Sequence, residues 1–213
     1  PLDAACVYRE IYKVRNRFVI IDDFYTDPIG LVKHALDTKL SHKGQGNYAG
    51  QMTTQSFLSE HHRSLFEQLT LEKPINSATD GNGRIRFSLP TDSFKQDIHF
   101  DGLGVNWSGV IYLSQYHPEV DGTIFWQHRK TGLEEIPHDL DELRKHGLGS
   151  QQAIESLLQV DGVDKSKWRK MFAIPYRFNR LVLFRPWLFH SPGPAFGTDL
   201  SNSRIVQTLF LGS

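Results

Sequence analysis

The beginning of the chain shows one strand pattern followed by one helical pattern. Residues 17–24, Arg-Phe-Val-Ile-Ile-Asp-Asp-Phe, form a short apolar run rich in β-branched side chains, which predicts a buried strand. Asp27 and Pro28 then provide a helix cap and a favourable first helical residue. We expect an amphipathic helix whose apolar face packs in the core. The residues of this face are Leu31, Val32, Ala35, Leu36 and Leu40.

A second helix is expected further along the chain. The stretch 41–50 is rich in glycine and polar residues, which indicates a loop. Ser59 can cap the helix that follows, and Leu65, Phe66 and Leu69 fall on one face of it.

From residue 84 onward the apolar positions change to the two-residue period of β-strands. Proline, aspartate and glycine separate the apolar runs and mark turns. Short strands at regular spacing are typical of a sandwich or barrel rather than a parallel sheet. The expected strands are 84–88, 97–101, 109–113, 123–126, 180–184 and 204–211.

Residues 127–172 interrupt the β pattern with charged and helical segments. Leu140 and Leu143 lie one helical turn apart, Ser150 can cap another helix, and 165–171 reads as a short basic helical piece. We interpret this stretch as an insertion between two strands of the barrel. Insertions of this length often form lids or substrate-binding loops.

Charge and cysteine content narrow the possible functions. The chain has 213 residues with 24 basic and 24 acidic side chains, so we expect no nucleic-acid partner. The single cysteine, Cys6, excludes an internal disulfide and zinc sites built on two or more thiolates. No apolar run approaches the roughly 18 residues of a membrane span, and the start lacks a signal-peptide pattern. We expect a cytoplasmic protein with no membrane partner, in which any metal is held by nitrogen and oxygen ligands.

The tripeptide His99-Phe100-Asp101 carries the strongest chemical signal. Residues two apart on a strand point to the same face, so an imidazole and a carboxylate lie side by side. A closed site needs a third ligand, and His190, which follows the expected strand 180–184 and a turn, is the natural one. Two histidines and one carboxylate form the facial triad of non-haem Fe(II) oxygenases and leave the other metal positions open.

Arg204 begins the last expected strand, among apolar residues that include Val206 and Leu209. An arginine that faces a barrel interior needs an anion, because its charge is otherwise buried without a partner. A dicarboxylic cofactor that chelates the metal at one end would supply this anion at its other end. The planar guanidinium suits a carboxylate in a bidentate contact.

With these residues the chain resembles the 2-oxoglutarate/Fe(II)-dependent dioxygenases, in particular their prolyl-4-hydroxylase-like branch. The resemblance covers about residues 84–126 and 173–211. The chain departs from the branch in a longer spacing between His190 and Arg204 and in the insertion. The matching segments are His99-Phe-Asp101, Tyr112-Leu-Ser114 for Tyr-Leu-Asn, Asp121-Gly-Thr-Ile-Phe125 for part of Gly-Gly-x-Thr-x-Phe, Asn179-Arg-Leu-Val-Leu-Phe184 for Gly-x-x-x-x-Phe, His190 and Arg204.

The resemblance implies a mainly β fold with flanking helices, whose core is a double-stranded β-helix of the jelly-roll or cupin-like type with a helical insertion. It implies one dioxygenase domain over 1–213. The N-terminal strand and helices would occupy 1–83, the β-helix core 84–126 and 173–213, and an inserted helical lid 127–172.

The resemblance also implies cofactors and residue roles. Fe(II) would be held by His99, Asp101 and His190, the catalytic centre, and 2-oxoglutarate and O2 would be the co-substrates. Arg204 would bind the far carboxylate of 2-oxoglutarate, with Tyr112 and Thr208 lining its pocket. The implied reaction is hydroxylation of an unactivated C–H bond.

The substrate is predicted from position. Trp126 and Arg129 follow the Gly-Thr-x-Phe strand, where the family's active-site mouth lies, so we expect a pocket wall and a carboxylate contact there. Alternatively, Arg129 and Lys130 form a solvated turn. We interpret His128 as a surface or lid residue. A compact domain without repeats fits a small-molecule substrate such as an amino acid or a natural-product precursor, and a peptide or protein side chain is the alternative.

Two other functional classes fit the same residues. A cupin-type hydrolase or isomerase would use the triad with zinc or manganese, but it gives Arg204 no role. A non-catalytic binding barrel would hold neither iron nor 2-oxoglutarate. In that case His99 is a core histidine bonded to Asp101, and Arg204 pairs with Asp199 at the surface.

Overall fold

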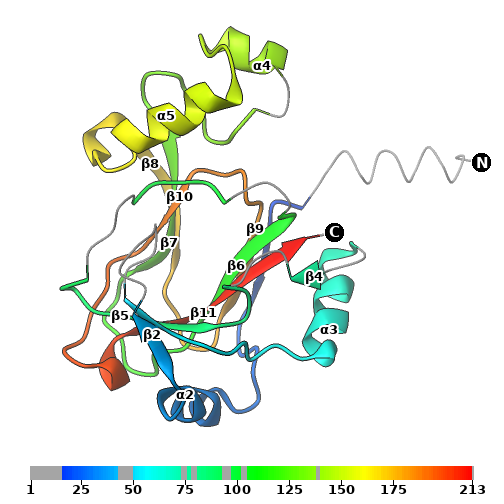
Figure 1. The fold of residues 1–213 in the computed structure, drawn as a ribbon, viewed down its shortest axis with the longest axis vertical. Coiled ribbons are helices and arrows are strands. Elements are labelled where there is room, and N and C mark those ends of the chain that lie inside the picture. Colours follow the sequence, from blue (N-terminus) through cyan, green and yellow to red (C-terminus); the bar gives the residue numbers. More distant parts are fainter. Residues whose placement is uncertain are drawn as a thin grey trace, which may run out of the picture.

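The computed structural model describes residues 16–42, 50–72, 76–77, 81–92, 97–101, 105–137 and 140–212. Two antiparallel sheets pack face to face; helices pack against the larger sheet, and further helices lie at one end of the smaller sheet (Figure 1). The larger sheet contains β1 (Phe18–Ile21), β2 (Leu40–His42), β3 (Gln51–Thr53), β4 (Asn76–Ser77), β5 (Ile85–Ser88), β6 (Trp107–Tyr112), β9 (Leu181–Phe184) and β11 (Arg204–Gly212). The smaller sheet contains β7 (Asp121–His128), β8 (Trp168–Pro175) and β10 (His190–Pro192).

The connections between the sheets define the fold class. The larger sheet has the order β1-β9-β6-β11-β5-β3-β2, with β4 also paired to β11, and the smaller has the order β10-β7-β8. The chain passes from β6 to the smaller sheet, returns in β9, crosses again to β10 and ends in β11. Such crossing antiparallel strands form the jelly roll of a double-stranded β-helix, so the predicted fold class is confirmed.

Side chains of the larger sheet alternate strictly between two environments. On β11, Ile205, Leu209 and Leu211 face a core layer, whereas Arg204 and Val206 face the space between the sheets. Strands β5, β6 and β9 follow the same alternation in register with β11. The two-residue period that predicted these strands therefore also separates the core side from the inner side.

Two helices cover the core side of the larger sheet. Helix α2 (Pro28–Leu36) begins as predicted, because the Asp27 carboxylate accepts from the Gly30 amide at 2.9 Å. Ala35 of α2 and Phe66 of α3 (Glu60–Thr70) are buried in the same apolar cluster. Among the described residues, no helix combines the length and apolar character needed to cross a membrane.

The helices of the predicted insertion pack at the end of the smaller sheet where β7 ends and β8 begins. Helices α4 (Leu140–Lys145) and α5 (Gln151–Asp161) bury Leu143, Ile154 and Leu158 against Trp126 and Trp168 on its outer face (Figure 1). None of the described residues of 127–172 lines the cavity between the sheets. This packing braces the smaller sheet and the segment 97–101, and the lid function of the insertion stays a prediction.

Three local predictions are corrected. Leu40 and Ser41 belong to β2 rather than to the first helix or a loop. Within 165–171, only Lys165–Lys167 is helical, as a 3-10 turn (η1), and β8 starts at Trp168. The segment 97–101 forms a single bridge with His190 instead of a strand, because its Ile98 and Asp101 amides bond to Gly162 and Pro186, outside the sheets. A second 3-10 turn, η2, spans Leu200–Asn202.

Arg185 anchors the loop between β9 and β10. The guanidinium of Arg185 is buried, lies 3.9 Å from the centre of the Trp107 ring and donates to Glu72 Oε1 at 2.6 Å. It also donates to the carbonyls of Asn16 and Asn106 at 2.9 and 3.1 Å. One side chain thus ties four separate segments together.

We expect Arg185→Met to lower the free energy of unfolding by about 3 kcal/mol, because it leaves the Glu72 carboxylate and two carbonyls without their donor. Chemical denaturation measures this change. The matched control is Arg144→Met, which removes an arginine whose side chain is 66% exposed, and which should change stability by less than about 0.5 kcal/mol. Equal losses in the two variants would show that Arg185 does not hold these segments together.

Candidate metal centre

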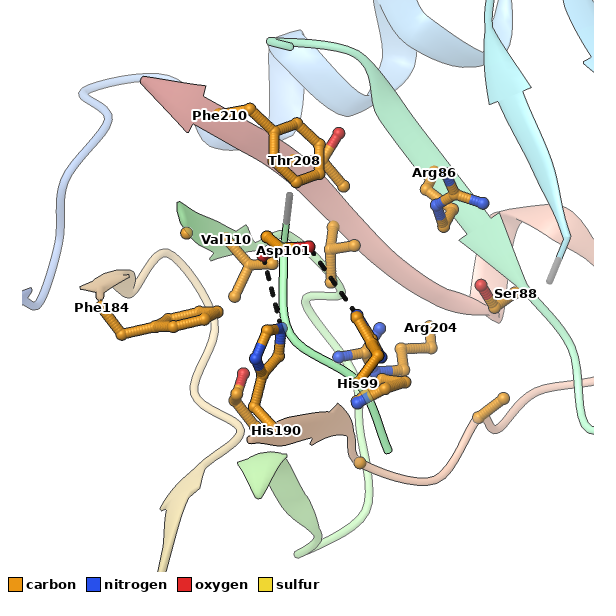
Figure 2. Close-up of a pocket in the computed structure, with 16 residues that line it drawn as sticks. Arg86, Ser88, His99, Asp101, Val110, Phe184, His190, Arg204, Thr208 and Phe210 are labelled. Carbon is orange, nitrogen blue, oxygen red and sulfur yellow. Dashed lines mark ion pairs between the residues drawn. The ribbon is translucent and has the colours of Figure 1, made fainter. Parts of the chain in front are cut away.

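Three potential metal ligands meet between the two sheets. His190 is the first residue of β10, whereas His99 and Asp101 lie on the extended segment 97–101 (Figure 2). The backbones of His99 and His190 exchange two hydrogen bonds of 2.9 Å, and the Asp101 amide donates to the Pro186 carbonyl at 2.9 Å. Ligand atoms of all three side chains lie within 4.8 Å of one another. The predicted convergence of His190 with His99 and Asp101 is therefore present in the structure.

Contacts at Nδ1 orient both imidazoles with Nε2 as the ligand atom. Nδ1 of His99 lies 2.9 Å from the Asp97 carbonyl, and Nδ1 of His190 lies 2.8 Å from the Leu188 carbonyl. A carbonyl only accepts, so each Nδ1 carries the proton and each Nε2 presents a lone pair. The His190 and His99 Nε2 atoms lie 3.4 and 3.8 Å from the carboxylate oxygens of Asp101.

Burial keeps the His190 imidazole in the neutral form that can bind a metal. The exposed fractions of His99, Asp101 and His190 are 2%, 8% and 5%. Burial lowers the pKa of His190 to about 4, although the nearby Asp101 carboxylate acts in the opposite direction. The His190 imidazole is therefore neutral at physiological pH. Two imidazoles and a carboxylate form a donor set that suits a divalent cation such as Fe(II).

Arg204 lines the same cavity and is almost fully buried. Its Nη2 donates to the Gly122 carbonyl at 3.0 Å, and its Nε has no hydrogen-bond partner. None of the carboxylates in the described part of the chain pairs with it. Asp199 instead caps η2 by accepting from the Ser201 and Asn202 amides, so the alternative surface pair is wrong. The site thus presents a buried cation to the cavity beside the three ligands.

Thr208 and Tyr112 occupy different places relative to the cavity. Thr208 lines it, and its hydroxyl donates to the Gly81 carbonyl at 2.8 Å. Tyr112 is fully buried behind the lining residue Thr123, with 2.8 Å between the two hydroxyl oxygens. Tyr112 therefore positions Thr123 rather than forming the wall that was predicted.

The two predicted substrate residues lie outside the cavity. Trp126 points to the outer side of β7, where its Nε1 donates to the Ser191 hydroxyl at 3.0 Å. Arg129 is exposed and its Nε donates to the Trp168 carbonyl. His128 is buried, not at the surface, and its Nε2 lies 3.1 Å from Asp161 Oδ2. Trp126 and His128 instead help to fix α5 against the smaller sheet.

The structure adds cavity residues that the sequence reading missed. Arg86 and Ser88 on β5 line the cavity, as do Val110 on β6 and Phe184 on β9 (Figure 2). The signal that could have found Arg86 is alternation: it lies two residues before Ser88, on the face of β5 opposite to the apolar Ile85 and Phe87.

We expect Tyr112→Phe to change how stability depends on alkaline pH. Burial raises the pKa of Tyr112 to about 12, whereas an unfolded tyrosine ionises near pH 10. The raised value stabilises the native state fully below pH 10 and less as the pH rises towards 12. The stability difference between wild type and variant should therefore shrink by roughly 1–2 kcal/mol from pH 9 to 11.5 in urea denaturation. The control is Tyr116→Phe, at a residue that is 82% exposed. Its stability should depend on pH in the same way as that of wild type. A constant difference would contradict the assignment.

Comparisons with solved structures show distant similarity. HygX from Streptomyces hygroscopicus with nickel and 2-oxoglutarate bound is 11% identical, with a TM-score of 0.46, over 100% of this chain and 87% of that chain. The Fe(II)/(alpha)ketoglutarate-dependent dioxygenase TqaL is 11% identical, with a TM-score of 0.43, over 99% and 90%. HygX with iron bound is 14% identical, with a TM-score of 0.37, over 100% and 87%. These similarities are too distant to assign an activity.

Sequence comparison identifies a family. No curated protein matches the chain. A family model described as a family of unknown function, DUF6445, matches residues 3–204. Because this match spans most of the sequence, the chain belongs to the DUF6445 family.

Proposed function

We propose that this protein is an Fe(II)/2-oxoglutarate-dependent oxygenase that hydroxylates an unactivated C–H bond of a small substrate, such as an amino acid or a natural-product precursor. One observation carries the proposal: the His99–Asp101–His190 cluster and the buried guanidinium of Arg204 line the same cavity. A cupin-type hydrolase or isomerase would explain the three ligands, but it would leave Arg204 without a function.

The cluster has the donor set that holds Fe(II) in this chemistry. His99, Asp101 and His190 would bind the cation, and their backbone bonds and Nδ1 contacts keep the side chains in place before it binds. When bound, iron and 2-oxoglutarate supply the oxidising chemistry with O2, and the protein supplies geometry and exclusion of water.

Arg204 has the properties of a carboxylate anchor. Its Nε is buried and lacks a partner, so a bound carboxylate would relieve an unfavourable state of the protein. We assign to it the far carboxylate of 2-oxoglutarate. Thr123 and Thr208 offer hydroxyl groups on the same lining, and Tyr112 holds Thr123 in place.

Other features of the chain support the finer parts of the proposal. The order of His99-x-Asp101, Tyr112-Leu, Gly122-Thr-x-Phe125 and Arg204 is the basis for placement in the prolyl-4-hydroxylase-like branch. A single cysteine suits a reducing compartment such as the cytoplasm. Residues 1–213 would form one catalytic domain.

We expect Asp101→Ala to bind Fe(II) at least tenfold more weakly than wild type, because it removes one of three ligands. Anaerobic calorimetry with Fe(II), and with Ni(II) as an inert replacement, measures this affinity. Asp97→Ala is the control, since it removes a nearby carboxylate outside the cluster while the Asp97 carbonyl that holds His99 remains. Unchanged Fe(II) binding in Asp101→Ala would eliminate the triad as the metal site.

We expect Arg204→Leu to keep Fe(II) and to weaken 2-oxoglutarate binding by two to four decades, roughly, because deleting one partner of a buried charge pair costs about 3–5 kcal/mol. Calorimetry with Ni(II)-loaded protein measures the 2-oxoglutarate affinity. The unliganded variant should be at least as stable as wild type, since the substitution removes a buried cation whose charge no described carboxylate balances. Full 2-oxoglutarate affinity in Arg204→Leu would favour the cupin-type alternative.

A further inference from the structure

The cavity contains a second guanidinium, which the proposed cofactor binding does not use. Arg86 on β5 is 8% exposed and lines the cavity together with the metal cluster and Arg204 (Figure 2). Its Nη2 lies 3.4 Å from Met52 Sδ, a weak acceptor. Arginine has five N–H donors and a bidentate carboxylate contact uses two of them, so Arg86 can bind an anion while it keeps its other contacts.

Strand register places the two arginines on one wall. In the β5–β11 pair, Arg204 lies opposite Ser88 and Val206 lies opposite Arg86. Arg86 and Arg204 are therefore diagonal neighbours on the same face, roughly 7–8 Å apart at the backbone. Two carboxylates of different molecules, or of one long molecule, can be held by guanidinium groups at such a separation.

The other side of the cavity is apolar. Val110, Phe184 and Phe210 contribute side chains there. Figure 2 shows Val110 and Phe184 on the opposite side of the His99–Asp101–His190 cluster from Arg86. The space around the metal ligands thus has a basic wall and an apolar wall, which match a molecule with one anionic group and one hydrocarbon part.

We infer that Arg86 is a specificity-determining residue and that the primary substrate is a small free carboxylate with an apolar body, held by Arg86 at its carboxylate and by Val110 and Phe184 at its hydrocarbon part. The inference rests on the proposed function for the reaction and adds the substrate class. It excludes an internal residue of a peptide, which has no free main-chain carboxylate.

The test uses binding rather than turnover. Ni(II)- and 2-oxoglutarate-loaded protein is titrated with a panel of the common amino acids and of straight and branched monocarboxylates of four to ten carbons, each paired with its primary amide. At least one carboxylate should bind and raise the melting temperature, and its amide should bind at least tenfold more weakly. Arg86→Met should weaken the carboxylate at least tenfold and leave 2-oxoglutarate affinity unchanged. Arg86→Lys should be intermediate, and Arg144→Met should match wild type.

The outcomes separate the two proposals. Equal binding of acid and amide, or no binding by any member of the panel, overturns the substrate class. If Arg86→Met loses 2-oxoglutarate instead, Arg86 is the cofactor anchor and the inference is wrong while the oxygenase assignment stands. If neither Ni(II) nor 2-oxoglutarate binds wild type but the metal-free protein binds carboxylates through Arg86, the anion site stands and the oxygenase assignment fails.

Discussion

The strict alternation of side chains along β5, β6, β9 and β11 is the constraint on which both core and cavity depend. One face buries Phe87, Ile111 and Leu209 beneath α2 and α3, and the other carries Arg86 and Arg204. A shift of one residue in the register of β11 would exchange the two faces, moving a guanidinium into the apolar layer. The packing that stabilises the larger sheet therefore also fixes the direction in which the charged groups point.

This constraint explains how far the sequence could predict the structure. Period-two runs are local signals, so most strands, the cap at Asp27 and the proximity of His99 to Asp101 on one side of the chain were accessible. The prediction that Trp126 forms a pocket wall rested on its position beside the Gly-Thr-x-Phe motif and is wrong. Thr123 and Phe125 face inward, so the alternation of side chains along β7 points Trp126 outward. The same parity argument would have identified Arg86.

The remaining errors concern surfaces that meet only in three dimensions. Amphipathicity indicates which side of α5 is buried, but the surface that receives it is made by Trp126, Trp168 and Phe189, from three distant segments. Similarly, 97–101 has a strand-like pattern, yet its Ile98 and Asp101 amides bond to Gly162 and Pro186 outside the sheets, and it joins β10 through the single bridge to His190. These partners were set by tertiary packing, which a pattern along one segment does not contain.

The paired backbone bonds between His99 and His190 link the candidate metal site to the assembly of the fold. They join two segments that lie far apart along the chain. In the sequence, helices α4 and α5 stand between these segments. Contacts of such long range are entropically expensive to close. Both imidazoles are therefore brought together only when the smaller sheet and the segment 97–101 have docked. A cation bound by these side chains would stabilise the assembled chain over forms in which the two segments are apart.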